Sequence, residues 1–232
     1  MKDVLERLRG GLTVSCQAEP ASPLRNPLVM AAMAGAAELG GAIAIRAQGV
    51  DDIAAIREAC PLPIIGLIKR RTPGCDVYIT PAARDADAIA EAGATIIAMD
   101  GTARPRPGGD TLEEMISRVH ERHGVPVMAD IDSVESARRA VDAGADIVGS
   151  TLAGYTLRPS VPGPDIGLVA RLVEALDVPV IAEGRYTSPD QVRAAFAAGA
   201  HAVVIGGAIT DTTRLTERFA AARPEARTSA LG

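Results

Sequence analysis

The stretch GVPVMADIDSVESARRAVDAGADIVGST, residues 124–151, holds one complete repeat of the pattern that decides the fold. An apolar, β-branched run comes first, a segment with helical spacing of its apolar residues follows, and a second apolar run ends the stretch. Runs this short and this apolar are typical of buried parallel strands. Ala-Gly-Ala at 143–145 separates helix from strand, because glycine takes the left-handed conformation that ends a helix. The stretch therefore predicts a strand–helix–strand unit of a parallel sheet.

The same pattern recurs along the 232 residues of the chain. Strands are expected at 11–17, 41–47, 63–69, 94–100, 125–131, 145–151, 179–184 and 202–207. Helices are expected at 27–39, 51–60, 81–92, 111–123, 133–143, 165–176, 188–198 and 212–222. Strict alternation predicts a parallel sheet with right-handed crossovers, and eight units favour closure. An open doubly wound sheet is the main competitor, but no GxGxxG follows the first strand. We predict an α/β protein that is a single (β/α)8 TIM barrel.

The two ends of the chain complete this assignment. The segment MKDVLERLRGG at 1–11 is charged and amphipathic, and we expect a short N-terminal helix there. Residues 1–222 are assigned to one barrel domain. The last residues, RPEARTSALG at 223–232, are predicted to be a flexible tail.

Local signals mark several helix starts. Asn26, Thr80 and Ser188 each precede a proline, so each is expected to be the N-cap of a helix that has proline at its first position. Thr111 with Glu114 fits a capping box, in which both side chains satisfy free backbone donors.

The composition narrows the class of protein. The chain is 47% hydrophobic but only 2% aromatic, so its core must consist of Ala, Val, Ile and Leu. The formal net charge is −5, and acidic and basic residues are mixed along the chain. This pattern argues against a nucleic-acid surface, since such surfaces are strongly basic.

Cysteine usage and hydropathy indicate a cytoplasmic protein. The three cysteines, Cys16, Cys60 and Cys75, form no CxxC motif, and three cannot all be joined in disulfides within one chain. We therefore expect reduced thiols. The N-terminus lacks the apolar segment of a signal peptide. The most apolar stretch, 28–45, is rich in Ala and Gly and is interrupted by Glu38, so it predicts a helix and a strand and no membrane span.

Several predicted strands end in a polar side chain. These residues are Gln17, Arg46, Lys69, Asp100, Asp130 and Glu183. Because side chains alternate along a strand, Lys69 shares the inward face with Leu67, and Glu183 shares it with Ile181. Single residues of this kind often form salt bridges at a barrel rim. Burying a whole ring of charged side chains is costly, so such a ring is expected only where the residues share a functional site. We therefore expect these side chains to converge on one cavity at the carboxyl ends of the strands.

Glycines follow the last two predicted strands. Gly184 comes directly after Glu183, and Gly206 and Gly207 end the last strand. The loops after strands 7 and 8 are the usual phosphate site of a TIM barrel, because backbone N–H groups approach the anion there. Tight turns are the alternative explanation. Arg185 either adds a positive charge to this site or lies in solvent.

Metal catalysis has little support in the sequence. His120 and His123 fall in the helix at 111–123, and His201 precedes the last strand at the opposite end of the barrel. Asp100 and Asp130 offer two carboxylates without a third ligand. We expect no metal site and no cofactor. No histidine partners a serine or cysteine at the rim, which argues against hydrolysis by a catalytic triad.

One loop is longer than the others. About ten residues of KRRTPGCDVYITP, 69–81, follow Lys69 before the next helix. Such a loop is long enough to close over a substrate. A surface excursion without function is the alternative.

Motifs along nearly the whole chain resemble the N-acetylmannosamine-6-phosphate 2-epimerase family. They are VSCQA at 14–18, IR at 45–46, IIGLIKR at 64–70, VYITP at 77–81, MADI at 128–131, DIVGSTLAGYT at 146–156, PVIAEGR at 179–185 and GGAIT at 206–210. The resemblance implies a (β/α)8 isomerase that interconverts N-acetylmannosamine 6-phosphate and N-acetylglucosamine 6-phosphate in sialic acid and amino sugar catabolism. The implied partner is a small phosphosugar, and the assembly to test is a homodimer.

The resemblance also implies roles for individual residues. Lys69 would be the catalytic lysine and Glu183 its partner acid. Gln17, Arg46 and Asp130 would either contact the substrate or belong to the surrounding hydrogen-bond network. Family members often carry an arginine directly after AIT, where this chain has Asp211. We expect Asp211 to cap the last helix, and Arg214 to replace the missing guanidinium or to lie exposed on that helix.

Epimerisation at C2 removes a proton beside the C1 carbonyl of the open-chain sugar and returns it to the other face. It needs a base, a proton source and stabilisation of enolate-like charge, which Lys69 and Glu183 can supply without metal. Which of the two moves the C2 proton stays open. A class I aldolase or lyase with Lys69 as Schiff base is the first alternative. A phosphosugar-binding barrel without catalysis is the second.

Overall fold

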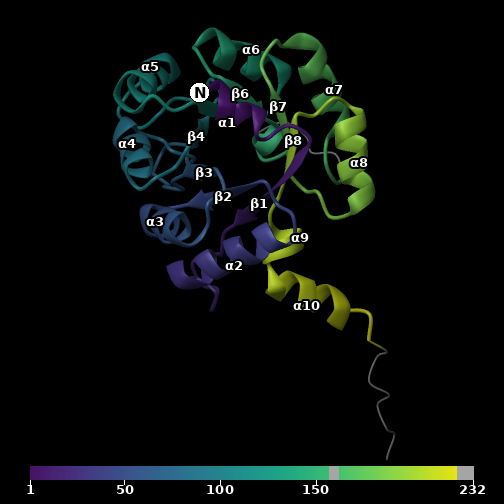
Figure 1. The fold of residues 1–232 in the computed structure, drawn as a ribbon. Helices are drawn as coiled ribbons and strands as arrows, with labels where there is room; N and C mark the ends of the chain where they lie inside the picture. The colour runs from purple at the N-terminus through teal and green to yellow at the C-terminus, as the bar shows by residue number, and fades with distance from the viewer. Residues whose placement is uncertain (157–161, 224–232) are drawn as a thin grey trace, which may run out of the picture.

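Within residues 1–156 and 162–223, which the computed structural model describes, eight parallel strands close into a barrel in chain order (Figure 1). The strands are β1 (Gly11–Cys16), β2 (Ala44–Gln48), β3 (Ile64–Leu67), β4 (Ile96–Asp100), β5 (Val127–Asp130), β6 (Ile147–Gly149), β7 (Val180–Glu183) and β8 (Ala202–Ile205). Parallel pairing of β1 with β8 closes the barrel, with Thr13 opposite Val204. The predicted TIM barrel is confirmed.

A helix follows each strand, and all of these helices except α10 surround the barrel (Figure 1). They are α2 (Pro27–Leu39), α3 (Val50–Ala59), α4 (Ala83–Glu91), α5 (Leu112–His123), α6 (Val134–Asp142), α7 (Ile166–Ala175), α8 (Pro189–Ala197) and α10 (Thr212–Ala220). Three short elements are added: α1 (Lys2–Glu6), a 3₁₀ turn η1 (Ser150–Leu152) and α9 (Gly207–Thr210). The expected N-terminal helix is thus present. Most of the predicted tail, from residue 224 onward, lies outside the described residues.

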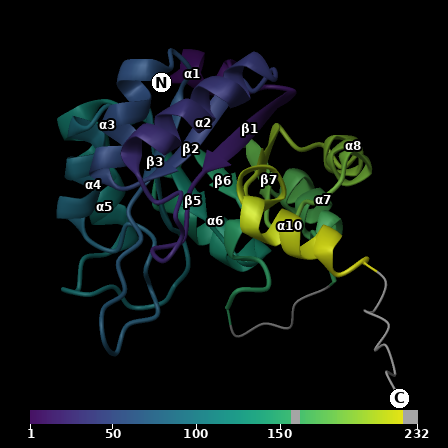
Figure 2. The same cartoon turned by 90° about the horizontal axis from the view of Figure 1, so that it is seen from below.

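Small aliphatic side chains form two cores, one inside the barrel and one between strands and helices. Ile65, Met128 and Ile181 point inward, and Cys16 packs under the helices as its strand position predicts. Leu8, which follows α1, is fully buried in the inner core, and His201 Nε2 lies 2.8 Å from the Leu5 carbonyl oxygen. This N-terminal segment closes the end of the barrel opposite the long loops (Figure 2).

The segment after β3 folds as a β-hairpin. Antiparallel bridges join Lys69 to Ile79 and Thr72 to Cys75. The returning arm lies against β4, because the Asp100 amide donates to the Ile79 carbonyl oxygen at 3.0 Å. The hairpin therefore takes the place of direct β3–β4 pairing near the carboxyl ends of these strands.

Thr80 at the end of this hairpin is not the predicted helix cap. Helix α4 begins later, at Ala83, and its N-cap residue Ala82 makes no side-chain bond. Thr80 is fully buried with φ of +42°, and its hydroxyl donates to the Ala98 carbonyl oxygen at 2.6 Å. The hydroxyl therefore ties the hairpin to β4. The caps predicted at Asn26, Ser188 and Thr111 are confirmed.

The last two helices also depart from expectation. Strand β8 ends at Ile205, and α9 follows before the expected helix starts. Helix α10 has no buried residue, and Figure 1 shows it pointing away from the barrel. Its start at Thr212 follows the prediction, whereas its lack of packing against the barrel does not.

A glycine in β3 tests how tightly strands and helices pack. A Cβ on Gly66 would lie 2.5 Å from the Ala94 Cβ and 3.0 Å from the Ile53 Cδ1. Gly66→Ala should therefore lower the free energy of unfolding by about 1–3 kcal/mol through overpacking. Gly35→Ala in α2 is the control, since nothing lies within 4 Å of its Cβ, and a gain of about 0.5–1 kcal/mol is expected from helix propensity. Urea unfolding measures both. Equal stability of the two variants would contradict this packing.

Candidate active site

The guanidinium of Arg46 lies at the centre of the site. It is 1% exposed and bridges strands that face one another across the barrel. Nη2 lies 2.5 Å from Asp130 Oδ2, and Nη1 lies 3.1 Å from Asp130 Oδ1 and 2.9 Å from Glu183 Oε2. Burial opposes the charge of Arg46, but Asp130 and Glu183 outweigh burial and raise its pKa. The inward positions predicted for these three residues are confirmed.

The η1 turn after β6 holds Glu183 from two sides. The Ser150 hydroxyl donates to the Glu183 carbonyl oxygen at 2.9 Å and accepts from its amide at 3.0 Å. The Thr151 hydroxyl lies 2.6 Å from Asp130 Oδ1 and 3.0 Å from Glu183 Oε2. Burial raises the pKa of Glu183 to about 7, despite the neighbouring Arg46. Sequence reasoning missed both hydroxyl residues, although they follow a strand end directly.

Lys69 lies at the mouth of the barrel, with part of its side chain open to solvent. Its Nζ donates to Gln17 Oε1 at 2.5 Å, and Gln17 Nε2 donates to Ser15 Oγ at 2.7 Å. Desolvation, helped by the positive charge of Arg46, lowers the pKa of Lys69. The structure therefore brings Gln17, Lys69, Arg46 and Glu183 to one mouth, as the strand ends predict.

The hairpin at 68–80 forms one wall of this mouth. Arg70 pairs with the buried Asp85 at 2.5 Å, which anchors the hairpin to α4. The Arg71 guanidinium lies 4.8 Å above the ring centre of Tyr78. Burial and the charge of Asp130 raise the pKa of Tyr78. Closure of this hairpin over a substrate stays a prediction.

The glycines after β7 and β8 lie where the sequence places them. Gly184 has φ of +109°, a conformation that side chains rarely adopt. Gly206 precedes α9 and Gly207 is its first residue. Backbone N–H groups in the first turn of a helix lack partners within the helix. These loops therefore present backbone donors at the mouth.

Two predicted arginines have protein partners. Arg185, with φ of +61°, donates through Nε to the Gly163 carbonyl oxygen at 2.7 Å and through Nη1 to that of Ala153 at 2.6 Å. It also lies over the Tyr155 ring, 5.3 Å from its centre. Arg214 is 79% exposed on α10, with Nε 3.4 Å from an oxygen of Asp211.

Asp211 caps α10, as predicted, since its carboxylate accepts from the Arg214 amide at 3.0 Å. The sequence left open whether Arg214 replaces the missing guanidinium or lies exposed on the helix, and in the structure it lies exposed. Its contact with a substrate stays a prediction.

The remaining polar residues make structural contacts. Asp100 belongs to a rim salt bridge, because Arg104 Nη2 lies 2.6 Å from its carboxylate. His120 pairs with Asp146 at 2.7 Å, and His123 pairs with Asp87 at 2.9 Å. Among the described residues no cluster of three or more His, Cys, Asp or Glu side chains is arranged to hold a metal ion.

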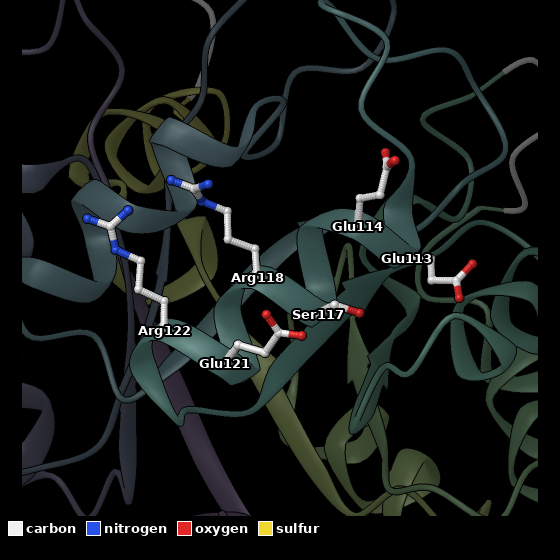
Figure 3. Close-up of a pocket in the computed structure, with 6 residues that line it drawn as sticks. All are labelled: Glu113, Glu114, Ser117, Arg118, Glu121 and Arg122. Atoms are coloured by element: carbon white, nitrogen blue, oxygen red, sulfur yellow. The ribbon is translucent and has the colours of Figure 1, made fainter.

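A surface pocket on α5 has no part in this site. Figure 3 shows the side chains that line it, all from one helix. They are Glu113, Glu114, Ser117, Arg118, Glu121 and Arg122. Arg118 and Arg122 pair with Asp87 of α4 at 2.6 and 3.2 Å. The pocket is therefore the charged outer surface of a helix, away from the strand ends.

Comparisons with known proteins agree on one family. Residues 30–225 match the family described as putative N-acetylmannosamine-6-phosphate epimerase. A putative N-acetylmannosamine-6-phosphate 2-epimerase from Cutibacterium acnes is 48% identical over 219 residues, covering 93% of this chain and 95% of the relative. One of the same description from Thermosynechococcus vestitus is 50% identical over 217 residues, covering 93% and 94%.

The solved structure of the N-acetylmannosamine-6-phosphate 2-epimerase from Clostridium perfringens superposes with a TM-score of 0.91 at 40% identity. The match covers 94% of this chain and 95% of that one. In the described part of the chain, no helix has the length and apolarity needed to cross a membrane.

The buried ion pair yields a prediction for stability. Arg46→Met leaves Asp130 buried without its cation, so the free energy of unfolding should fall by about 3–5 kcal/mol. Adding Asp130→Asn removes the stranded charge and should restore part of that loss. Arg193→Met is the control, since Arg193 forms an exposed pair with Asp190 that contributes about 0–1 kcal/mol. Urea unfolding of the wild type, both single site variants, the double variant and the control tests this, and strict additivity of Arg46→Met and Asp130→Asn would contradict the coupling.

Proposed function

The chain belongs to the N-acetylmannosamine-6-phosphate epimerase family, and on that premise we propose that it interconverts N-acetylmannosamine 6-phosphate and N-acetylglucosamine 6-phosphate. The observation that carries the proposal is the meeting of an amine, Lys69, and a carboxyl group, Glu183, beside the buried Arg46. Both ionisable groups have pKa values displaced toward neutrality. Paired groups of this kind are what proton transfer at C2 requires.

Lys69 is proposed to remove and return the C2 proton. Making a neutral amine at pH 7 from an ordinary lysine costs about 4.6 kcal/mol. Desolvation and the charge of Arg46 reduce this cost. Glu183 then holds or protonates the sugar oxygens during ring opening, while Gln17 and Asp130 orient Lys69 and Arg46 through direct contacts.

The positive charges at the mouth make a metal unnecessary in this proposal. Arg46 is held rigidly by Asp130 and lies beside Glu183. A fixed, buried guanidinium stabilises developing enolate charge strongly. No cofactor is needed, since proton transfer alone inverts C2.

The phosphate group is proposed to lie against the loops after β7 and β8. The positive φ of Gly184 and the position of Gly207 at the start of α9 support this placement. Arg185 supports it indirectly, by tying its loop to Ala153 and Gly163. Asp211 lies near Gly207, and Arg214 offsets its negative charge there. Direct contacts of Arg185 and Arg214 with the substrate belong to the proposal.

The proposed assembly is a homodimer in the cytoplasm. Leu215 and Phe219 lie one turn apart on α10, and Phe219 is 75% exposed. Ile209 of the adjacent α9 is also exposed. Burial of a Phe side chain contributes about 1.5–3 kcal/mol, which favours a second copy as the cover of this face. The cysteines are all free, which supports a reducing compartment.

Lys69 provides the main test of function. The chain contains two lysines, Lys2 and Lys69, so Lys2→Met is a matched control. In D₂O the wild type should incorporate deuterium at C2 of the phosphosugar. Lys69→Met should slow this exchange by ~10²- to 10⁴-fold, because the base is lost, while Lys2→Met should exchange normally. Mass spectrometry follows the exchange, and rapid exchange by Lys69→Met would refute the assignment.

The same assay separates the alternatives. Exchange should persist after prolonged treatment with EDTA, and loss with rescue by one divalent ion would refute the metal-free mechanism. Borohydride with substrate should leave Lys69 unmodified, since an adduct there would identify a Schiff-base aldolase. Binding of phosphosugar without any exchange by the wild type would identify a non-catalytic binding barrel.

The dimer is tested on α10. Phe219→Glu places a charge on the apolar face and should shift the mass in solution from dimer to monomer, because an unpaired buried charge is costly. Thr213→Glu, on the opposite face of the same helix, should leave the mass unchanged. Light scattering after gel filtration measures both. A wild-type protein that is monomeric at high concentration would rule out this interface.

A further inference from the structure

Thr151 makes more carboxylate contacts than it has hydrogens. Its hydroxyl lies 2.6 Å from Asp130 Oδ1 and 3.0 Å from Glu183 Oε2. A hydroxyl donates one hydrogen bond and can also accept. If both carboxyl groups were ionised, one of these short contacts would join two oxygens with no hydrogen between them. Both contacts are hydrogen bonds only when one of the two carboxyl groups carries a proton.

Asp130 is the carboxyl group that stays ionised. It is fully buried, and each of its oxygens accepts from Arg46, at 3.1 and 2.5 Å. Bidentate pairing with a guanidinium is the strongest support that a carboxylate finds in a protein. The shorter of the two Thr151 contacts is also the one to Asp130. The hydrogen of Thr151 is therefore assigned to Asp130.

Glu183 is then the carboxyl group with the proton. The groups that face it are Arg46 from β2, Lys69 from the end of β3, Asp130 from β5 and Thr151 from η1. Arg46 Nη1 also lies 2.9 Å from Glu183 Oε2, and a neutral carboxyl group can still accept that hydrogen bond. The one buried cation, Arg46, is then balanced by one anion, Asp130. A second anion would leave excess negative charge inside the barrel, which is costly. Burial raises the pKa of Glu183. A Thr151 hydroxyl that donated to the ionised carboxylate would lower that pKa, so the direction of this one hydrogen bond decides between the two forms.

We propose that the Thr151 hydroxyl accepts a hydrogen bond from protonated Glu183 while it donates to Asp130, so that Glu183 enters the reaction as a neutral acid. Thr151 is thus a positioning residue that acts through Glu183. This rests on the proposed function, and it decides between the two open assignments of acid and base. Glu183 gives its proton to a sugar oxygen and becomes a carboxylate, and Lys69, as the neutral amine, takes the C2 proton.

The sign of one titration tests the inference. An acceptor for the acid form raises the pKa of a carboxyl group, whereas a donor to the ionised form lowers it. Thr151→Val should therefore move the titration of Glu183 to lower pH, by roughly one unit for one lost hydrogen bond. Thr151→Ser should restore it. A shift to higher pH, or no shift, would overturn the proposal.

The titration is followed by carbon-13 NMR of the glutamate side-chain carboxyl groups in the substrate-free protein. Glu183→Gln identifies the signal by its absence. Thr156→Val is the control, because Thr156 belongs to the same segment but donates to Asp132. It should leave the titration of Glu183 unchanged. A movement as large as that in Thr151→Val would show a general disturbance of the segment and would contradict a specific role.

Kinetics separate this inference from the proposed function. At pH 8 or above, where a one-unit fall in the pKa of Glu183 lowers its protonated fraction about tenfold, Thr151→Val should lower the rate of C2 exchange about tenfold, with KM nearly unchanged. A wild type without exchange would defeat the proposed function whatever the titration shows. Normal exchange in the wild type together with an unshifted titration in Thr151→Val would defeat the role of Thr151 alone.

Discussion

The buried guanidinium of Arg46 is the constraint on which the site depends. A charge that is 1% exposed persists only if partners satisfy it, and Asp130 and Glu183 do so from strands across the barrel. This pairing fixes the positions of β2, β5 and β7 at their carboxyl ends. Burial of Lys69 and the positive charge of Arg46 nearby lower the pKa of Lys69. One interaction therefore links the closure of the barrel to the acid–base character of its mouth.

Much of the fold and of the site could be predicted from the sequence because two patterns recur along it. One is the order of the signals for helices and strands, and the other is the alternation of side chains along each strand. Ala-Gly-Ala after three of the helices and proline before three of the strands set the order of elements, and alternation along each strand decided which side chains point inward. Gln17, Arg46, Lys69, Asp130 and Glu183 meet at one mouth for that reason. The cap at Asp211 was predictable because a carboxylate satisfies free backbone donors at a helix start.

The features that could not be predicted depend on contacts between segments that are far apart in the sequence. Thr80 has the sequence signature of a helix cap, but its hydroxyl bonds to β4, and the hairpin that carries it has no strong periodic pattern. Asp130 and Glu183 are the last residues of their strands, whereas Thr151 lies just beyond the end of β6, where a threonine is equally common in a turn. Its role is visible only once two carboxyl groups lie within 3.0 Å of it. The sequence of α10 does not reveal that the helix points away from the barrel. An amphipathic helix has the same pattern of residues whatever packs against its apolar face.

The distribution of aromatic residues has an optical consequence. The chain has no tryptophan and three tyrosines. Tyr78 lies in the hairpin after β3, and Tyr155 and Tyr186 lie in the loops after β6 and β7, so all three surround the mouth. Tyrosine emission and the near-ultraviolet circular dichroism of this protein therefore report mainly on the mouth of the barrel and, through the buried Tyr186, on the core beneath it. Binding at the strand ends is expected to carry its own spectroscopic signal, without any label.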